Sequence, residues 1–257
     1  MIKNLRAALS ESQQQANPEE SPLPQDGKPL VEQRRHRLAD HYDAKSANYY
    51  AGDREDMRKL VPSGVKRLLD VGCGNGAFGC SLKRERPGIY VAGIELTDWA
   101  ETAREHLDGV YQVDAERDDL NVMGKFDCIT FNDVLEHLFD PWKIVSRLSE
   151  QLDPGGYVIA SSPNMRFFHV LKALVLNKRF DYGEAGVMDR THVRWFTVKT
   201  FPELFQSVGL TVVDSGGHGD DGNFPFKLNL INKLCGNALD DTRYPQVYCI
   251  ARKPPVV

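Results

Sequence analysis

The sequence predicts an α/β protein built on a parallel, doubly wound sheet, and three observations support this prediction. Short apolar runs alternate with helix-like stretches from residue 67 onward, which is typical of parallel strands joined by crossover helices. The first apolar run, at 67–71, stops at a glycine-rich turn, and acidic or amide residues follow the first four runs. With 257 residues, of which 41% are hydrophobic, the chain is long enough for one such domain with appendages.

The individual elements follow from the apolar runs and from the residues that start and stop them. Strands are expected at 67–71, 89–94, 110–113, 126–131, 157–161, 210–214 and 247–252, and helices at 97–107, 141–152 and 197–208, besides one that ends near Pro87. Thr97 or Asp98 is the expected N-cap of the helix at 97–107. Asp140 and Pro141 start the next helix, and the turn at 153–156 ends it.

The segments outside this alternation predict the domain organisation. Residues 1–29 are rich in Gln, Glu, Ser and Pro and include four prolines, so we expect a disordered tail. Residues 30–62 combine dense charge with a few apolar positions, which predicts a helical extension before the domain at 63–257. Two long connections inside that domain, at 162–196 and 215–246, are expected to form lids or binding surface, with extra packing helices as the alternative.

Composition and charge argue against several classes of protein. The formal net charge of −4 gives no basic excess for a nucleic-acid groove, so no nucleic-acid partner is expected. The five cysteines are scattered without a C-x-x-C pair, which favours a reducing, cytoplasmic location. No signal peptide or transmembrane segment is recognisable, weak membrane association stays open, and the sequence does not determine the oligomeric state.

The glycine-rich turn carries the first functional signal. Gly72, Gly74 and Gly76 let the backbone turn sharply and approach a ligand closely. Asp70 lies two residues before the first glycine, and a carboxylate there would repel a pyrophosphate. It suits a cationic, phosphate-free nucleotide such as S-adenosylmethionine (SAM), which carries a sulfonium and an ammonium group. The turn also satisfies the dinucleotide fingerprint, with Glu95 near the position of its ribose acid, so a dinucleotide or a ligand-free turn remains an alternative.

Polar residues at the strand ends outline the rest of the ligand site, because ligands of open α/β sheets bind beyond the carboxyl ends of the strands. Glu95 can accept both ribose hydroxyls. Asp114 can accept the exocyclic amine of adenine, and Leu96 or Ala115 can lie against the ring. Asp70 can face the amino acid moiety. The expected cofactor-binding residues of this edge are Asp70, Gly72, Gly74, Gly76, Glu95, Leu96, Asp114, Ala115 and Asn132.

Taken together, these motifs resemble those of the class I SAM-dependent methyltransferases. The matching residues are L-L-D-V-G-C-G-N-G at 68–76, Glu95, Asp114, N-D-V-L-E-H at 132–137 and the L-x-P-G-G turn at 152–156, and the similarity covers roughly residues 65–214. The resemblance implies SAM as the cofactor and a Rossmann-like sheet of seven strands with helices on both faces. The sheet would be mostly parallel, with an antiparallel last strand inserted between the fifth and the sixth. Residues 30–62 would then cover the cofactor site.

A finer resemblance is to bacterial methyltransferases associated with glycan and lipopolysaccharide biosynthesis. It is carried by Y-Y-x-x-x-R at 49–54, S-x-P-N at 161–164 and H-x-R-x-F-T at 192–197. It implies that Tyr50 and Arg54 contribute to the cofactor site and that the acceptor is a sugar or glycan intermediate. Basic and aromatic residues that could wall the acceptor pocket are Tyr49, Tyr50, Arg54, Arg166, Arg190, Arg194 and Trp195.

Two histidines are the candidate catalytic residues. Methyl transfer to oxygen needs an in-line approach and often a base for the hydroxyl proton, and His137 and His192 could each supply that base. Asp133, Glu136 and His137 form D-x-x-E-H, whose spacing predicts one shared helix face. The motif is similar to one in small-RNA 2′-O-methyltransferases and ubiquinone-pathway O-methyltransferases. In the former a later histidine, here His192, completes a divalent-metal site, although Asp133 replaces the usual first glutamate.

The main hypothesis is therefore a SAM-dependent methyltransferase that acts on an oxygen of a sugar, glycan or sugar nucleotide. A small lipid-like or quinone-type acceptor is the first alternative, which the apolar run at 170–176 supports. A catalytically silent SAM-binding adaptor is the second. A divalent metal at Asp133, Glu136, His137 and His192 competes with a purely structural role of these residues.

Overall fold

The computed structural model describes residues 53–120, 124–220 and 226–255. Every described residue lies in one compact unit, His41–Val257. The predicted tail at 1–29 and most of the predicted helical extension at 30–62, Tyr50 included, lie outside the described residues.

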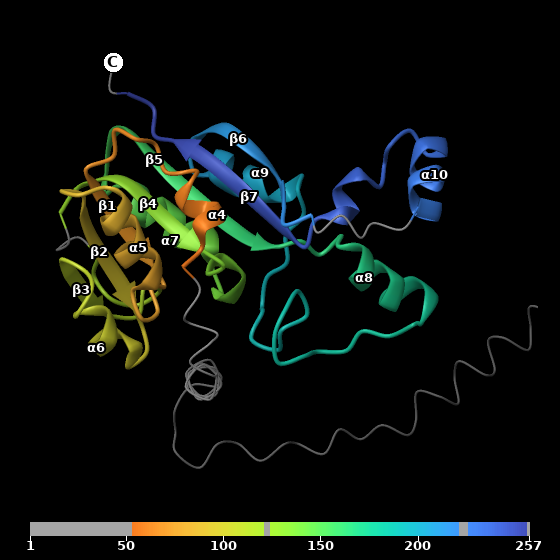
Figure 1. The fold of residues 1–257 in the computed structure, drawn as a ribbon, viewed down its shortest axis with the longest axis horizontal. Helices are drawn as coiled ribbons and strands as arrows, with labels where there is room; N and C mark the ends of the chain where they lie inside the picture. The colour runs from red at the N-terminus through yellow and green to blue at the C-terminus, as the bar shows by residue number, and fades with distance from the viewer. Residues whose placement is uncertain (1–52, 121–123, 221–225, 256–257) are drawn as a thin grey trace, which may run out of the picture. The chain divides into compact units, whose positions relative to one another are not determined.

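A seven-stranded sheet with helices on both faces forms the body of the fold (Figure 1). Its strands are β1 (Arg67–Val71), β2 (Tyr90–Glu95), β3 (Gly109–Gln112), β4 (Phe126–Asn132), β5 (Leu152–Pro163), β6 (Thr211–His218) and β7 (Gln246–Arg252). They lie in the order β3-β2-β1-β4-β5-β7-β6. Strands β1 to β5 pair in parallel, and β7 is antiparallel to both of its neighbours, which confirms the predicted topology.

The strand order places a topological switch point between β1 and β4. From β1 the chain proceeds to β2 and β3 on one side, and it then returns to β4 and β5 on the other. Ligands of open α/β sheets bind at such a point, beyond the carboxyl ends of the strands. The ends of β1 and β4 carry Asp70 and Asn132, so the order of the strands brings two of the predicted site residues side by side.

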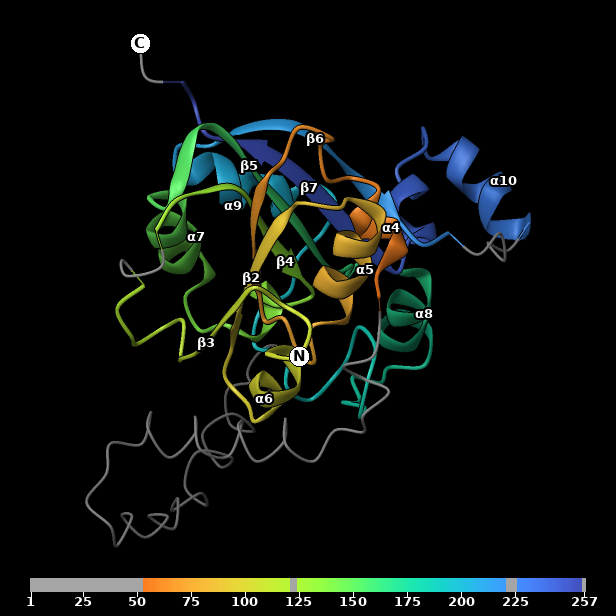
Figure 2. The same cartoon turned by 60° about the vertical axis from the view of Figure 1, so that its left-hand side comes forward.

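Two hydrophobic clusters hold helices against the two faces of the sheet (Figure 2). The described helices are α4 (Glu55–Arg58), α5 (Ala77–Glu85), α6 (Trp99–Ala103), α7 (Pro141–Ser149), α8 (Phe168–Leu171), α9 (Thr200–Ser207) and α10 (Phe226–Leu234). Helices α4 and α5 pack on the face that carries Leu68, whereas α7 and α9 pack on the face that carries Leu69. Successive side chains of a strand point to opposite faces, so the apolar run of β1 contributes to both clusters.

Three predicted helix limits are wrong by three residues or more. Helix α9 begins at Thr200 rather than at residue 197. Helix α6 ends at Ala103 instead of residue 107. Turns follow it, and in the last of them the Leu107 N–H donates to the Ala103 carbonyl at 2.9 Å. Helix α7 ends at Ser149 because β5 already begins at Leu152. The register then shifts between Phe126 and Cys128 of β4. The predicted turn at 153–156 is thus an irregularity within β5.

Two long connections lie at the carboxyl edge of the sheet. Residues 164–199 join β5 to α9 and contain α8 and a π-helical turn at Lys172–Leu176. Residues 219–245 join β6 to β7 and contain α10 and a 3₁₀ turn at Asp240–Arg243. Within the described parts of the chain, no helix has both the length and the apolar character needed to cross a membrane.

Candidate functional site

The switch point holds a buried carboxyl group. Asp70 is only 2% exposed. Its Oδ1 accepts hydrogen bonds from Thr130 Oγ1 at 2.7 Å and from Asn132 Nδ2 at 3.1 Å, both on the adjacent β4. Burial raises the pKa of Asp70 to about 7, although the two hydrogen bonds act in the opposite direction. Near neutral pH this group changes between acid and carboxylate, and a neighbouring cation would favour the carboxylate.

The glycine-rich turn directly follows β1 in the chain and packs against the turn after β4. Gly72 has a φ of 69°, in the left-handed region where other residues are strained. The N–H groups of Gly72 and Cys73 both donate to the Ile94 carbonyl, at 2.8 and 3.0 Å. A Cβ on Gly72 would lie 2.6 Å from Val134 Cγ2. Glycine is therefore required at position 72 both by its backbone conformation and by the close approach of Val134.

Glu95 supports the same turn from the end of β2. It is 6% exposed, and its Oε2 accepts from the Gly74 N–H at 2.8 Å. Its Oε1 accepts from the N–H groups of Leu96 and Thr97 and from Thr97 Oγ1, at 3.0, 2.9 and 2.8 Å. A carboxylate offers about four acceptor positions. The protein itself therefore occupies much of the capacity that the sequence analysis assigned to two ribose hydroxyls, and Oε2 has room for one more donor.

The other predicted cofactor residues follow the same edge of the sheet. Leu96 is 49% exposed directly after β2, although it is a large apolar side chain. Asp114 accepts from the Glu116 N–H at 2.9 Å, and the Ala115 carbonyl accepts from Arg147. Asn132 Oδ1 is buried and has no hydrogen-bond partner among the described residues. A buried amide oxygen without a partner is costly, so a ligand donor at this position would stabilise the site.

A second group of side chains lies at the acceptor side of the sheet. Glu136, His137 and His192 bring their ligand atoms within 4.8 Å of one another, and the two imidazole centroids are 4.7 Å apart. Glu136 and His137 belong to a 3₁₀ turn at Leu135–His137, whereas His192 comes from the connection at 164–199. The Glu136 carbonyl accepts from the N–H groups of Val193 and Arg194 at 2.8 and 2.9 Å. These two bonds fasten the connection to the turn.

The hydrogen bonds of the histidines define their tautomers. Nδ1 of His137 is 3.3 Å from the Thr191 carbonyl, and Nδ1 of His192 is 3.0 Å from the Val187 carbonyl. A carbonyl can only accept, so Nδ1 of each neutral ring carries the proton and Nε2 keeps the lone pair. His192 Nε2 lies 4.0 Å from Glu136 Oε1. The group can thus take a proton or ligate a cation.

Glu136 adds a buried carboxyl to this group. It is 1% exposed, and its Oε2 accepts from Ser162 Oγ at 3.1 Å. Its Oε1 is buried without a hydrogen-bond partner among the described residues. Burial, and after it the charge of Asp133, raises the pKa of Glu136 well above its ordinary value.

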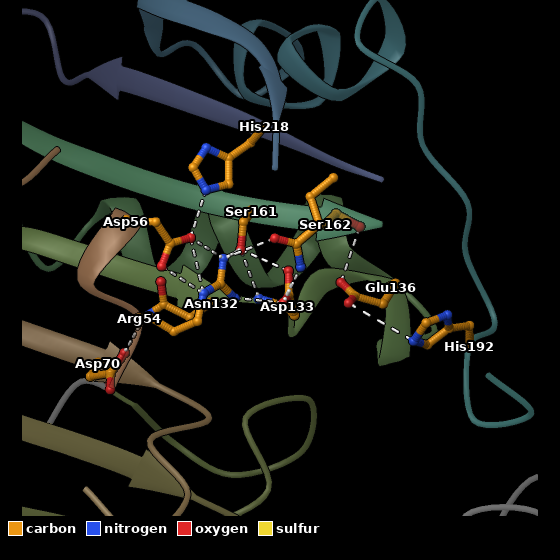
Figure 3. A network of polar contacts seen from close by, with 11 residues as sticks. Arg54, Asp56, Asp70, Asn132, Asp133, Glu136, Ser161, Ser162, His192 and His218 are labelled. Atoms are coloured by element: carbon orange, nitrogen blue, oxygen red, sulfur yellow. Dashed lines mark hydrogen bonds and ion pairs between the residues drawn. The ribbon is translucent and has the colours of Figure 1, made fainter. Parts of the chain in front are cut away.

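Asp133 is not part of this group, and its predicted place on a shared helix face is wrong. Its φ of 56° sets it off from the 3₁₀ turn that follows. Its Oδ2 accepts from Arg54 Nη1 at 2.5 Å and from Gln246 Nε2 at 2.7 Å. Its Oδ1 accepts from Ser161 Oγ at 2.7 Å (Figure 3). The carboxylate therefore interacts with Arg54 rather than with the histidines.

Arg54 interacts with several protein groups at this edge, and its contribution to the cofactor site stays a prediction. Besides Asp133 it donates to Asp56, Ser161 and Gln246, so protein groups bind the guanidinium that was expected to contact the cofactor. Sequence reasoning missed Asp56, Gln246 and His218 of this network and quoted Ser161 only as part of a motif. It also missed Thr130, which donates to Asp70. A usable signal was their position, because Ser161, His218 and Gln246 stand at the same edge of three neighbouring strands.

Comparisons with known proteins identify the family to which the chain belongs. The family model of the methyltransferase domain matches residues 30–215. A ubiquinone biosynthesis O-methyltransferase from Aromatoleum aromaticum is 36% identical over 117 residues, which are 43% of this chain and 49% of that protein. The chain spans about half the length of the first curated relatives it matches.

Solved structures show the same fold at low sequence identity. A SAM-dependent methyltransferase from Archaeoglobus fulgidus superposes with a TM-score of 0.56 at 20% identity, covering 77% of this chain and 91% of that one. An O-methyltransferase family protein from Burkholderia thailandensis gives a TM-score of 0.60 at 16% identity, covering 90% and 65%. With the family model matching most of the sequence, this chain belongs to the methyltransferase-domain family.

Proposed function

We propose that this protein binds SAM at the switch point between β1 and β4 and methylates an oxygen atom of a small acceptor. The observation that carries the proposal is the pair formed by the buried Asp70 carboxyl and the unpartnered Asn132 Oδ1. An ammonium group has three donors and a positive charge, and these two groups offer it a carboxylate and a free acceptor. A pyrophosphate would instead require bare N–H groups and no carboxylate.

The other residues of the edge fit the rest of the cofactor. The exposed Leu96 supplies apolar surface for the adenine ring, Asp114 supplies an acceptor for its amine, and Glu95 Oε2 retains one acceptor position for a ribose hydroxyl. When bound, SAM supplies an electrophilic methyl group. Nε2 of His137 or His192 is then the base that takes the acceptor's hydroxyl proton.

Calorimetric titration with S-adenosylhomocysteine (SAH), the demethylated product, tests the cofactor site. We expect a dissociation constant of about 10 μM or below for the wild type. Asp70→Ala and Glu95→Ala should each weaken binding by about 10-fold to 100-fold, since each removes a polar partner of the ligand or of its turn. Asp153→Ala, near the opposite end of β5, is the control and should bind like the wild type. Equal affinities throughout, or preferential binding of a dinucleotide, would contradict the proposal.

For the acceptor we propose a quinone-type hydroxyl rather than a sugar. The first curated relatives are named for ubiquinone biosynthesis and for O-methylation. The arginines that would serve a sugar phosphate are engaged with protein groups. Arg166 pairs with Asp241 at 2.6 Å, and Arg190 pairs with Glu184. Arg194 donates to backbone carbonyls.

The connection at 164–199 supports a lipid-like acceptor. Its exposed large hydrophobic side chains are Leu174, Val175, Leu176, Phe180 and Tyr182, of which Leu176 is 71% exposed. Exposed apolar side chains that lie next to one another often mark a binding surface, whereas single exposed ones are common everywhere.

Transfer of labelled methyl groups from SAM separates the candidate acceptors. A hydroxylated benzoquinol with a short isoprenoid tail should be methylated, and a set of sugar nucleotides should not. Methylation of the sugar nucleotides alone would restore the sugar hypothesis. SAH binding without transfer to any fraction of a cell extract would indicate a SAM-binding adaptor. For the active enzyme we propose a cytoplasmic location, which the five free cysteines favour.

We further propose that Glu136, His137 and His192 hold a divalent cation or share the base function. Their ligand atoms, within 4.8 Å of one another, need only a small inward movement to reach the roughly 3.4 Å that separates ligands of a tetrahedral ion. A bound cation would polarise the acceptor hydroxyl. His137→Ala and His192→Ala should each lower turnover by about 100-fold and leave SAH affinity unchanged. A chelator should reproduce this loss if a cation is required and should have no effect if the histidines act as bases.

A further inference from the structure

A short strap at the amino end of the described chain runs from the ligand edge of the sheet onto the face that carries Leu68. It consists of residues 53–58, which include α4 (Figure 1). At one end Arg54 donates to groups on or next to β4, β5 and β7. At the other end Arg58, 5% exposed, donates to Glu85 of α5 at 2.8 Å. The strap is therefore fixed at two separate points, one at the candidate site and one away from it.

The contact at the site joins two residues with unusual backbone conformations. Arg54 has a φ of 45° and Asp133 a φ of 56°, and neither is a glycine. Left-handed backbone is unfavourable for such residues and persists only where the surroundings fix it. Here each residue supplies the other's ion-pair partner, at 2.5 Å. Asp56 adds a second carboxylate to Arg54, and its Oδ2 also contacts His218 Nε2 at 2.8 Å (Figure 3).

Asp133 connects the ion pair with Arg54 to the turn that carries the candidate catalytic residues. It lies between Asn132, which faces the cofactor edge, and the 3₁₀ turn that carries Glu136 and His137. Its N–H donates to Ser161 Oγ at 3.2 Å, and that hydroxyl donates back to Oδ1 at 2.7 Å. The next residue, Val134, packs against Gly72 of the glycine-rich turn. The strap, the glycine-rich turn and the turn at 132–137 therefore meet at Asp133.

The charges around Arg54 are compatible with a cationic ligand nearby. The guanidinium of Arg54 lowers the pKa values of both Asp70 and Glu136, although burial outweighs this effect in each. An unpaired arginine at this position would also repel a cationic ligand. Asp56 and Asp133 neutralise it, so Arg54 can fix the turn without opposing the ligand.

We propose that the ion pair between Arg54 and Asp133 is a latch that holds the turn at 132–137 between the cofactor edge and the acceptor-side histidines. Both residues are positioning residues, because they act through Glu136 and His137 of the turn. The proposal deepens the proposed function and rests on it for its catalytic consequence. The coupling between the strap and the turn can be tested in the ligand-free protein, independently of any activity.

Amide hydrogen exchange of the ligand-free protein tests the coupling. In Asp133→Asn and in Arg54→Gln the amides of 132–137 should exchange about 10-fold faster or more, because the turn loses its latch. In the exchange of the turn the double variant should match the single ones, since each single variant already removes the ion pair that the two residues share. Arg54→Lys keeps the charge and should restore most of the protection. Glu85→Gln, the matched control, removes the charge of the other anchor and should leave the turn protected.

Steady-state kinetics test the positioning role. Asp133→Asn and Arg54→Gln should lower kcat by about 10-fold or more while SAH affinity stays within about threefold, because misplaced groups lose rate before binding. SAH affinity is largely retained because Asp70 and Glu95 stand on β1 and β2, and because Asn132 stays in β4, where it pairs with Ser161 of β5. Should Asp133→Asn fail to fold in a thermal scan, Arg54→Gln carries the same comparison.

The outcomes separate the latch from its alternatives. Wild-type exchange and kcat in Asp133→Asn and Arg54→Gln would overturn the proposal. So would a Glu85→Gln variant that loosens the turn and lowers kcat as much as Asp133→Asn, since the strap would then only stabilise the fold. A wild type that binds no SAH and transfers no methyl would refute the proposed function, and the exchange data would still decide whether the latch exists.

Discussion

Replacing Asp70 with Asn should stabilise the fold and weaken the cofactor site in one step. Asn has nearly the same shape and keeps an Oδ1 to accept from Thr130 and Asn132, but it does not ionise. In the wild type, burial raises the pKa of Asp70 from 3.8 to about 7. The protein therefore carries a carboxyl group that is costly to ionise in the folded state, at the point where we propose that a cationic ligand binds.

The sign and size of the effect follow from proton linkage. Between about pH 4 and pH 7 the unfolded chain has an ionised Asp70 while the folded chain keeps the proton, so the folded state binds more protons. The free energy of unfolding therefore falls as the pH rises through this window. A shift of about 3 units corresponds to about 4 kcal/mol in all, of which about 3 kcal/mol falls between pH 5 and pH 8. Below about pH 4 both states are protonated and the penalty vanishes.

Urea unfolding of the wild type and Asp70→Asn at several pH values measures this difference. The stability advantage of the variant should grow by about 3 kcal/mol from pH 5 to pH 8, and Asp153→Asn should show no such trend. Wild-type SAH affinity should rise over the same range as the carboxylate forms, whereas the variant should bind weakly at every pH. A stability difference that does not change with pH would refute the reasoning, because it would mean that Asp70 titrates alike in both states.

Three further predictions concern single residues. Gly72→Ala should lower the free energy of unfolding by about 1–3 kcal/mol, because its Cβ would lie 2.6 Å from a valine methyl at a φ of 69°; Gly64→Ala, with nothing within 4 Å, should change it little in the same urea titration. Leu96→Ala should weaken SAH binding by about 10-fold in calorimetry without changing stability, since the side chain is already half exposed; a loss of stability would show that it belongs to the core. Asp140→Ala should cost about 1 kcal/mol by removing the cap bond to the Lys143 N–H. Asp98→Ala should not, because Asp98 makes no such bond to its helix, and similar losses in both would contradict the capping argument.

Local patterns in the sequence predicted the fold class and the cofactor edge. Buried parallel strands need near-continuous apolar runs. Such runs can be recognised in the sequence without knowing which strands pair with one another. The start of α7 was equally legible, because Asp140 and Pro141 form a capping signal that acts within four residues. The edge residues Asp70 and Glu95 were found because a strand end is also a fixed position in the sequence. All these features depend on the backbone's own periodicity and hydrogen bonding.

Strand and helix limits were predicted less well where tertiary pairing extends an element. Strand β5 begins at Leu152 because Phe126 pairs with it across the sheet, and nothing in the sequence of 152–156 reveals that partner. The hydrogen bonds of Glu95 were missed for a related reason. Gly74 is 21 residues away from it in sequence, and only the close packing of the two turns brings the N–H to the carboxylate.

The sequence by itself determined that polar side chains gather at one edge of a doubly wound sheet, because strand period and turn chemistry are properties of neighbouring residues. Only the tertiary structure decided what each of these side chains does. Asp133 has the helix spacing of a metal ligand, yet it is bound by Arg54, 79 positions away, and by Gln246, 113 positions away. Charge pairing depends on distance in space and on burial, and neither is encoded in the spacing of residues along the chain.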